Sequence, residues 1–132
     1  MITRAANAAL AVAALSLTAC SSPGHPAGEG SDADKLTKTV QAYNDAYFAG
    51  DAETAYAVLS KRCHEEMAPD LYAAIMQHVH EEYGSGHPAQ NVKPRIGGDL
   101  AQVTYTVQGL PQLDQHSQPW AREDGAWKYD AC

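Results

Sequence analysis

The stretch NVKPRIGGDLAQVTYTV, residues 91–107, is where the hydrophobic pattern of this chain changes from helical to extended. Its second half alternates apolar and polar residues, and the apolar positions are Ala101, Val103, Tyr105 and Val107. A period of two is typical of a strand with one buried face. The first half alternates in the same way at Val92, Pro94 and Ile96, and Gly97-Gly98-Asp99 between the halves is typical of a turn. The stretch therefore predicts two neighbouring antiparallel strands.

Three helices are predicted before this stretch. Apolar residues recur at spacings of three and four over Asp32–Ala49, over Asp51–Lys61, and from Pro69 to the residue before Gly84. Ser31 or Asp32 is expected to cap the first helix, and Gly50 to end it. The predicted buried stripe of the third helix consists of Leu71, Tyr72, Ile75, Met76, Val79 and Tyr83.

The remainder of the chain predicts a loop and a final hairpin. Residues 109–118 are polar and contain Pro111, which favours a loop. The segments 119–122 and 126–129 flank Glu123-Asp124-Gly125 as the arms of a hairpin, with Trp120 in one arm and Trp127 in the other. Helices followed by antiparallel strands predict an α+β fold, in which the N-terminal helices pack on one face of a curved sheet.

Three segments resemble the nuclear transport factor 2-like superfamily: YNDAYFAGD at 43–51, AYAVLS at 55–60 and REDGAWK at 122–128. The resemblance covers roughly residues 34–132, and small actinobacterial lipoproteins with such a domain are especially similar. It implies a cystatin-like α+β cone, in which a bent antiparallel sheet wraps the helices and leaves a pocket at the wide end. The residues that we expect to line this pocket are Tyr43, Tyr47, Tyr72, His78, Tyr105 and Trp127.

The resemblance also bears on function. Enzymes of the superfamily use an Asp, His or Tyr inside the cone for acid–base chemistry, but no candidate residue here lies in a motif that fixes a reaction. The sequence therefore favours a non-catalytic binding domain for a small apolar molecule or an envelope protein, with no catalytic residue and no cofactor. A pocket enzyme of the isomerase or dehydratase kind and an accessory structural envelope lipoprotein are the alternatives. A homodimer through the sheet face, as in the superfamily, stays open.

The N-terminus has the features of a lipoprotein signal peptide. One positive charge, Arg4, precedes an apolar run over 5–17 that is too short to span a bilayer. Leu17-Thr18-Ala19-Cys20 resembles the lipobox of bacterial lipoproteins, so we expect a signal peptide over 1–19 and acyl chains such as palmitate on Cys20. A Ser-, Pro- and Gly-rich tether over 20–33 would then join the lipid to a domain over 34–132 on the extracytoplasmic face of the cell membrane.

If Cys20 is lipidated, Cys63 and Cys132 remain. An even pair of cysteines in an oxidising compartment predicts a disulfide, and two free thiols are disfavoured there. His78 and Glu82 share a helix face, but the histidines lack the spacing of a zinc motif, so no metal is predicted.

The formal net charge of −7 bears on partners. It argues against nucleic acid, because binding to phosphates needs clustered Lys and Arg. It argues equally against a polybasic membrane patch.

Overall fold

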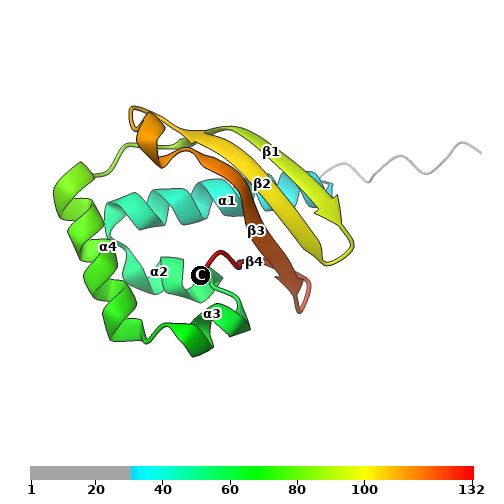
Figure 1. The fold of residues 1–132 in the computed structure, drawn as a ribbon, viewed down its shortest axis with the longest axis horizontal. Helices are drawn as coiled ribbons and strands as arrows, with labels where there is room; N and C mark the ends of the chain where they lie inside the picture. The colour runs from blue at the N-terminus through cyan, green and yellow to red at the C-terminus, as the bar shows by residue number, and fades with distance from the viewer. Residues whose placement is uncertain (1–30) are drawn as a thin grey trace, which may run out of the picture.

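A computed structural model of the chain describes residues 31–132 (Figure 1). The predicted signal peptide, Cys20 and nearly all of the predicted tether lie outside the described residues. No helix within the described part is long and apolar enough to cross a membrane.

Helix α1, Asp32–Ala49, has the bounds that the sequence predicts. Ser31 caps it through a capping box with Asp34, so each side chain satisfies a backbone N–H of the other residue. Gly50 ends it with φ of 72°, a left-handed conformation that glycine adopts without strain. The buried face of α1 runs through Leu36, Val40 and Tyr43 toward Phe48.

The predicted second helix, Asp51–Lys61, is wrong in its bounds. The structure has two helices here, α2 over Ala52–Val58 and α3 over Lys61–Glu66. Leu59 is extended and forms a parallel bridge with Tyr129, while the buried Ser60 side chain accepts from the Cys63 N–H and caps α3. Pairing with the last strand and the capping preference of serine therefore override the helical pattern.

Helix α4, Pro69–Tyr83, begins and ends where the sequence predicts, but its predicted stripe is too wide. Tyr72 and Met76 are buried, whereas Leu71 is 56% exposed and Ile75 is 38% exposed. The helix rests on the residues at spacing 72, 76, 79 and 83, so its neighbours at 71 and 75 face outward.

Four antiparallel strands form one sheet in the order β1-β2-β3-β4: Ala89–Gly97, Leu100–Val107, Gln115–Glu123 and Ala126–Tyr129. The predicted turn at Gly98-Asp99 and the predicted final hairpin are both present. The four apolar positions of the predicted alternation in β2 are buried, whereas Leu100 at the start of the strand is 64% exposed. On β1 the alternation is weaker: Val92 and Pro94 are partly buried, Ile96 is 38% exposed, and the pairing register shifts between Gln90 and Lys93.

The predicted loop over 109–118 is too long. A short 3₁₀ helix, η1, occupies Pro111–Leu113, and β3 already begins at Gln115, which pairs with Tyr105. The first residues of β3 are polar, and their side chains form hydrogen bonds within this segment. They therefore lack the alternation of apolar and polar residues that would predict a strand.

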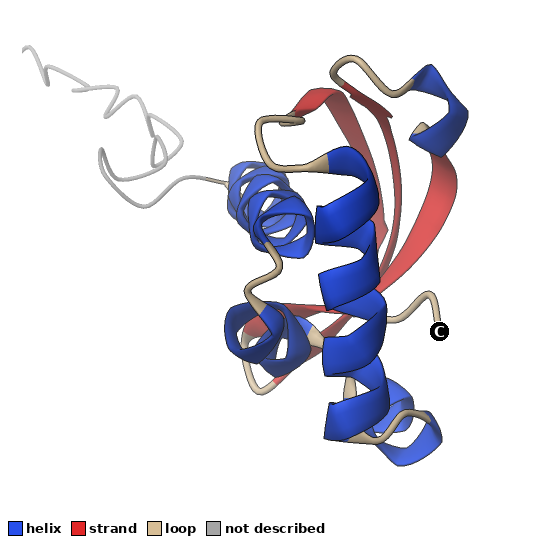
Figure 2. Ribbon diagram, turned by 90° about the vertical axis from the view of Figure 1, so that its left-hand side faces the viewer, coloured by secondary structure: helices blue, strands red, loops and turns tan. Residues whose placement is uncertain are grey.

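The fold is α+β, with the helices on one side of the sheet (Figure 2). In this view α1 is seen nearly along its axis, while α4 runs across it and the curved sheet covers the opposite side. The core between the layers holds α1 mainly against β1, with further contacts to β4. Trp120 of β3 is almost completely buried there.

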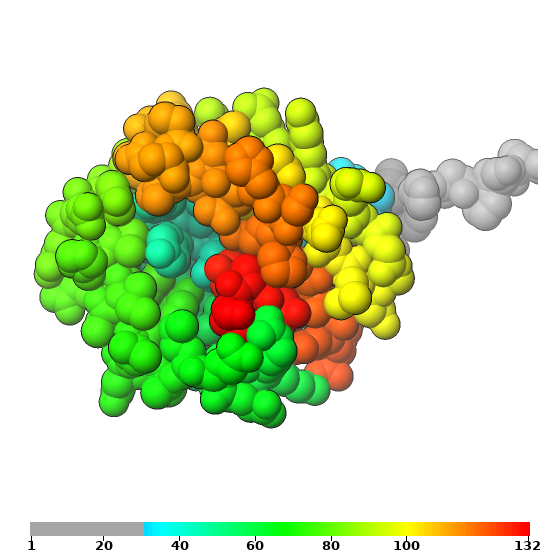
Figure 3. Space-filling view, in the orientation of Figure 1, coloured from blue at the N-terminus to red at the C-terminus, as the bar shows by residue number. Residues whose placement is uncertain are grey.

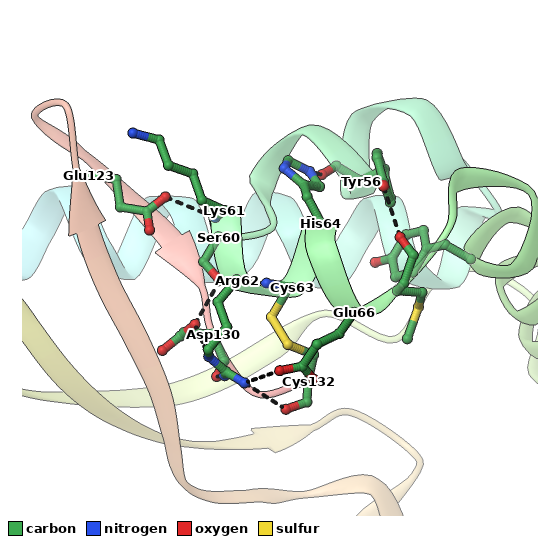
Figure 4. Close-up of a disulfide and its surroundings, with 12 residues drawn as sticks. Tyr56, Ser60, Lys61, Arg62, Cys63, His64, Glu66, Glu123, Asp130 and Cys132 are labelled. Carbon is green, nitrogen blue, oxygen red and sulfur yellow. Dashed lines mark hydrogen bonds and ion pairs between the residues drawn. A yellow bond between two sulfur atoms is a disulfide. The ribbon is translucent and has the colours of Figure 1, made fainter.

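The C-terminus is fastened to the helical layer (Figure 4). Cys63 of α3 and Cys132 form a disulfide with their Cα atoms 5.5 Å apart, in agreement with the predicted pairing. The Ser60 N–H donates to the Tyr129 carbonyl at 2.8 Å, and the Ser60 hydroxyl donates to the Asp130 carboxylate at 2.6 Å. Arg62 adds an ion pair with Asp130 at 3.2 Å. These contacts hold the short β4 strand at the α2–α3 junction.

Replacing both Cys63 and Cys132 with alanine is expected to lower the free energy of unfolding by about 4 kcal/mol, because the disulfide closes a long loop in the unfolded chain. The measurement is denaturant unfolding followed by circular dichroism. Reducing the wild-type protein should lower its midpoint to that of the double variant. A loss below about 1 kcal/mol would contradict the role of this bridge.

Candidate functional site

A cavity of about 340 Å³ opens between α1, α4 and the sheet. Figure 3 shows the hollow: atoms of α1, in cyan, lie at its floor between the green α4 and the orange segment of η1 and β3. The volume is at the lower end of the range for small-molecule sites. The residues that line it are Tyr43, Asn44, Tyr47, Phe48, Val79, Glu82, Tyr83, Tyr105, Val107, Leu113, Gln115, Gln118 and Tyr129.

Three of the six residues predicted to line the pocket do so: Tyr43, Tyr47 and Tyr105. The other three, Tyr72, His78 and Trp127, do not line the cavity, so the prediction from the sequence is wrong for them. Tyr72 is buried behind the pocket, where its hydroxyl lies 3.1 Å from that of Tyr43.

His78 and Trp127 both lie outside the cavity. His78 is on the exposed face of α4, with its Nε2 atom 3.4 Å from the Glu82 carboxylate. Trp127 is buried at the β3–β4 hairpin, under the guanidinium of Arg122 at 5.0 Å. Both pack or pair locally instead of contributing to the pocket.

Sequence reasoning missed most of the wall that the sheet supplies. Gln115 and Gln118 fall in the segment interpreted as a loop, and Tyr129 lies on the last strand, two residues from Trp127. The period of two in that strand places Trp127 and Tyr129 on the same side. The alternation that led to the prediction of Trp127 as a lining residue was therefore also a signal for Tyr129. Tyr83 and Val79 were predicted as part of the α4 stripe, but as core.

Aromatic rings form a large part of the pocket wall, six of its thirteen described lining residues. Tyr43 stacks on Tyr129 with ring centroids 4.7 Å apart and meets Trp120 edge to face at 5.8 Å. Tyr47 lies beside Tyr43 at 6.1 Å and meets Phe48 edge to face at 5.4 Å. Such offset and edge contacts fix the ring orientations. The floor of the cavity is therefore rigid, and Tyr47, Tyr83 and Tyr129 remain partly exposed at its mouth.

Amide side chains supply the polar part of the wall, and they are already hydrogen-bonded. The buried Gln118 accepts from the Trp120 indole N–H at 2.9 Å and donates to Gln115 at 3.1 Å. Asn44 donates to the His87 carbonyl at 2.7 Å. Because these amides have hydrogen-bond partners within the protein, they contribute mainly to the shape of the cavity and less to hydrogen bonding with a ligand.

The phenol groups of the pocket stay neutral at neutral pH. Burial raises the pKa of Tyr105 to about 12 and raises the pKa values of Tyr43, Tyr47 and Tyr129 as well. Glu82 is the carboxylate among the described lining residues, and its side chain is about half exposed at the rim. The described lining residues include no Ser, Cys, His, Lys or Arg. The cavity walls thus offer aromatic surface, neutral hydroxyls and amides.

No group of three metal-ligating side chains occurs within residues 31–132. His87 illustrates what the histidines do instead: its ring nitrogens lie 2.8 Å from the Gln108 carbonyl and 2.9 Å from the Tyr83 carbonyl. It connects the loops above α4 and β2 at the rim of the cavity.

Comparison with known proteins places the fold. No protein-family model and no curated protein matches the chain. Among solved structures, the chain is similar to a Campylobacter jejuni protein assigned as an NTF2-like transpeptidase. The TM-score is 0.52, over 74% of this chain and 96% of that one, and 13% of the aligned residues are identical. At this identity the likeness concerns the fold: an α+β cone of the NTF2-like type, as the resemblance in the sequence predicts.

The buried tyrosines predict how stability depends on pH. A phenol whose pKa is raised on folding stabilises the protein fully below the pKa of the unfolded chain, about 10, and loses that contribution as pH rises toward the folded value. For Tyr105 the window runs from about pH 10 to about 12. We expect unfolding and phenolate absorbance to rise together in this window. Titration of all tyrosines near pH 10 in a chain that stays folded by circular dichroism would contradict the buried aromatic pocket.

Proposed function

We propose that this chain is an extracytoplasmic lipoprotein, anchored through lipidated Cys20, whose cone binds a small and largely apolar organic molecule without transforming it. The observation that carries the proposal is the open cavity of about 340 Å³ with tyrosine walls and internally satisfied amides. Aromatic walls with a few polar groups are typical of small-molecule sites. The accessory structural alternative, a cone plugged by Trp120, Trp127 and Tyr105, is less well supported because a cavity of about 340 Å³ remains, with Tyr105 in its wall and neither tryptophan among its described lining residues.

Two features support export and anchoring. The lipobox-like Leu17-Thr18-Ala19-Cys20 follows an apolar run of signal-peptide length. The Cys63–Cys132 disulfide of the domain suits an oxidising compartment outside the cytoplasm. A tether of about ten residues would let the domain stand clear of the lipid headgroups.

Catalysis is the weaker candidate. Acid–base chemistry would need a group that exchanges a proton near neutral pH, and the phenols of the cavity have raised pKa values. The Campylobacter jejuni protein is named a transpeptidase. Acyl transfer of that kind uses a nucleophilic hydroxyl or thiol, and the described lining residues here include neither serine nor cysteine. The name therefore gives no support for that reaction in this chain.

Docking of an envelope protein or a second copy on the outer sheet face is the other binding hypothesis. That face carries Gln102, Thr104 and Thr106. Thr104 already accepts from the Ser117 N–H, and Thr106 donates to the Gln90 carbonyl. A polar surface engaged in this way is a poor docking site compared with the cavity.

Filling the cavity tests the binding function. Val79→Trp places a large ring at a lining position of α4 and is expected to weaken binding of apolar fragments at least about tenfold by blocking their space. Leu71→Trp, on the exposed face of the same helix, is the matched control and should bind as the wild type does. The measurement is a fragment titration followed by NMR. Fragments that bind both variants equally well would show that the cavity is not the site.

Cys20→Ser tests the anchor. In a bacterial host with lipoprotein processing, the wild-type chain should fractionate with the membrane and gain the mass of its acyl chains, whereas the variant should gain none. Cleavage before residue 20 should be lost as well. Acylation of the variant, or a wild-type chain that is soluble and unmodified, would refute lipid anchoring.

A further inference from the structure

The cavity lies in a part of the chain without basic side chains. Residues 39–60, 63–92 and 96–121 contain Asp and Glu but no Lys or Arg, and they supply every lining residue except Tyr129. The basic residues of the described chain are elsewhere: Lys35, Lys38, Lys61, Arg62, Lys93, Arg95, Arg122 and Lys128. Lys128, next to Tyr129, donates to the Ala57 carbonyl and is thereby directed to α2. The carboxylate of Glu82 is therefore the one formal charge among the described lining residues.

The aromatic rings of the cavity wall also favour a positively charged ligand. The faces of tyrosine and phenylalanine rings are electron-rich and attract cations. Tyr47, Tyr83 and Tyr129 are partly exposed at the mouth, and Tyr43, Phe48 and Tyr105 lie deeper. Glu82 places a carboxylate at the rim, close enough to Tyr83 to raise the pKa of that phenol. On its other side, the Glu82 carboxylate lies 3.4 Å from the Nε2 atom of His78, on the outer face of α4.

We propose that the cavity selects a small organic cation, an alkylated ammonium group, held by the tyrosine rings with Glu82 at the rim. This inference rests on the proposed binding function and names the class of its ligand. Anions are disfavoured because the described lining residues hold no positive charge to receive them.

The degree of alkylation follows from the hydrogen bonding of the wall. A primary ammonium carries three N–H donors and needs acceptors for all of them when it leaves water. The carbonyl oxygens of Gln118 and Gln115 already accept from Trp120 and Gln118, so two of the three lining amides have a donor within the protein. A quaternary ammonium has no N–H donor and an apolar surface of methyl groups, so it needs no such acceptors. It therefore fits a wall of aromatic rings in which most amide acceptors are engaged.

The experiment compares two probes of equal shape. Choline carries a trimethylammonium group, and 3,3-dimethyl-1-butanol replaces it with an uncharged tert-butyl group. Each is titrated into the detergent-solubilised lipoprotein, with NMR shifts of the tyrosine rings as the readout. We expect choline to bind about tenfold more tightly and to shift resonances of Tyr47, Tyr83 and Tyr129. Glu82→Gln should reduce this preference several-fold, whereas Glu65→Gln, the same charge change on α3, should leave it unchanged.

The outcomes separate this inference from the proposed function. Equal or tighter binding of 3,3-dimethyl-1-butanol at the same tyrosines would overturn the cationic ligand and leave a pocket for neutral molecules. A preference for choline that survives in Glu82→Gln but is lost in Glu65→Gln would place the site outside the cavity and overturn it as well. Absence of ring shifts with either probe would also overturn it, while the fragment titration with Val79→Trp still decides the binding function.

Discussion

The pairing of β4 with the junction between α2 and α3 is the constraint on which the rest of the structure depends. Leu59 and Ser60 leave the helical conformation to bond with Tyr129, and the Cys63–Cys132 disulfide locks the end of the chain to α3. This contact joins the last strand of the sheet to the helical layer. It also holds the Tyr129 ring against Tyr43 of α1, so one wall of the cavity exists only because the C-terminus is fastened.

The cavity combines side chains that are remote in the sequence into one chemical environment. Four come from consecutive turns of α1, others from the end of α4, and the rest from three strands and the 3₁₀ segment between two of them. Apart from Glu82, each contributes a ring, an amide or an aliphatic group, and Gln115 and Gln118 hydrogen-bond to each other. The Glu82 carboxylate lies at the rim, where it keeps its contact with water. The result is a site suited to recognition by shape and by aromatic surface.

The sequence predicts the fold well where a regular period meets a strong boundary signal. The bounds of α1 and α4 and the alternation of β2 follow from apolar spacing, capping residues and glycine or proline. It fails where tertiary pairing decides the local conformation. The break at Leu59–Ser60 depends on Tyr129, seventy residues away, and the polar start of β3 depends on pairing with Tyr105.

The same distinction holds for the site. Tyr43, Tyr47 and Tyr105 could be chosen because they lie on apolar faces of elements that surround the cone. His78 could not be excluded, since the sequence does not say which side of α4 faces the cavity. Trp127 lies on the same side of its strand as Tyr129, and the alternation does not say how far along the strand the cavity extends. The disulfide was predictable from cysteine arithmetic and compartment alone, because two cysteines were left for one bridge.

A native mass spectrum of the protein purified from its own membrane without reductant tests the central claim most directly, that the fastened cone carries a small ligand. The account predicts an acylated chain that begins at Cys20, is two hydrogens lighter than its reduced form, and releases one discrete small molecule on activation. The result that would contradict it is the same acylated and oxidised chain with no small molecule bound, so that the spectra of the wild type and of Val79→Trp show no difference in bound mass.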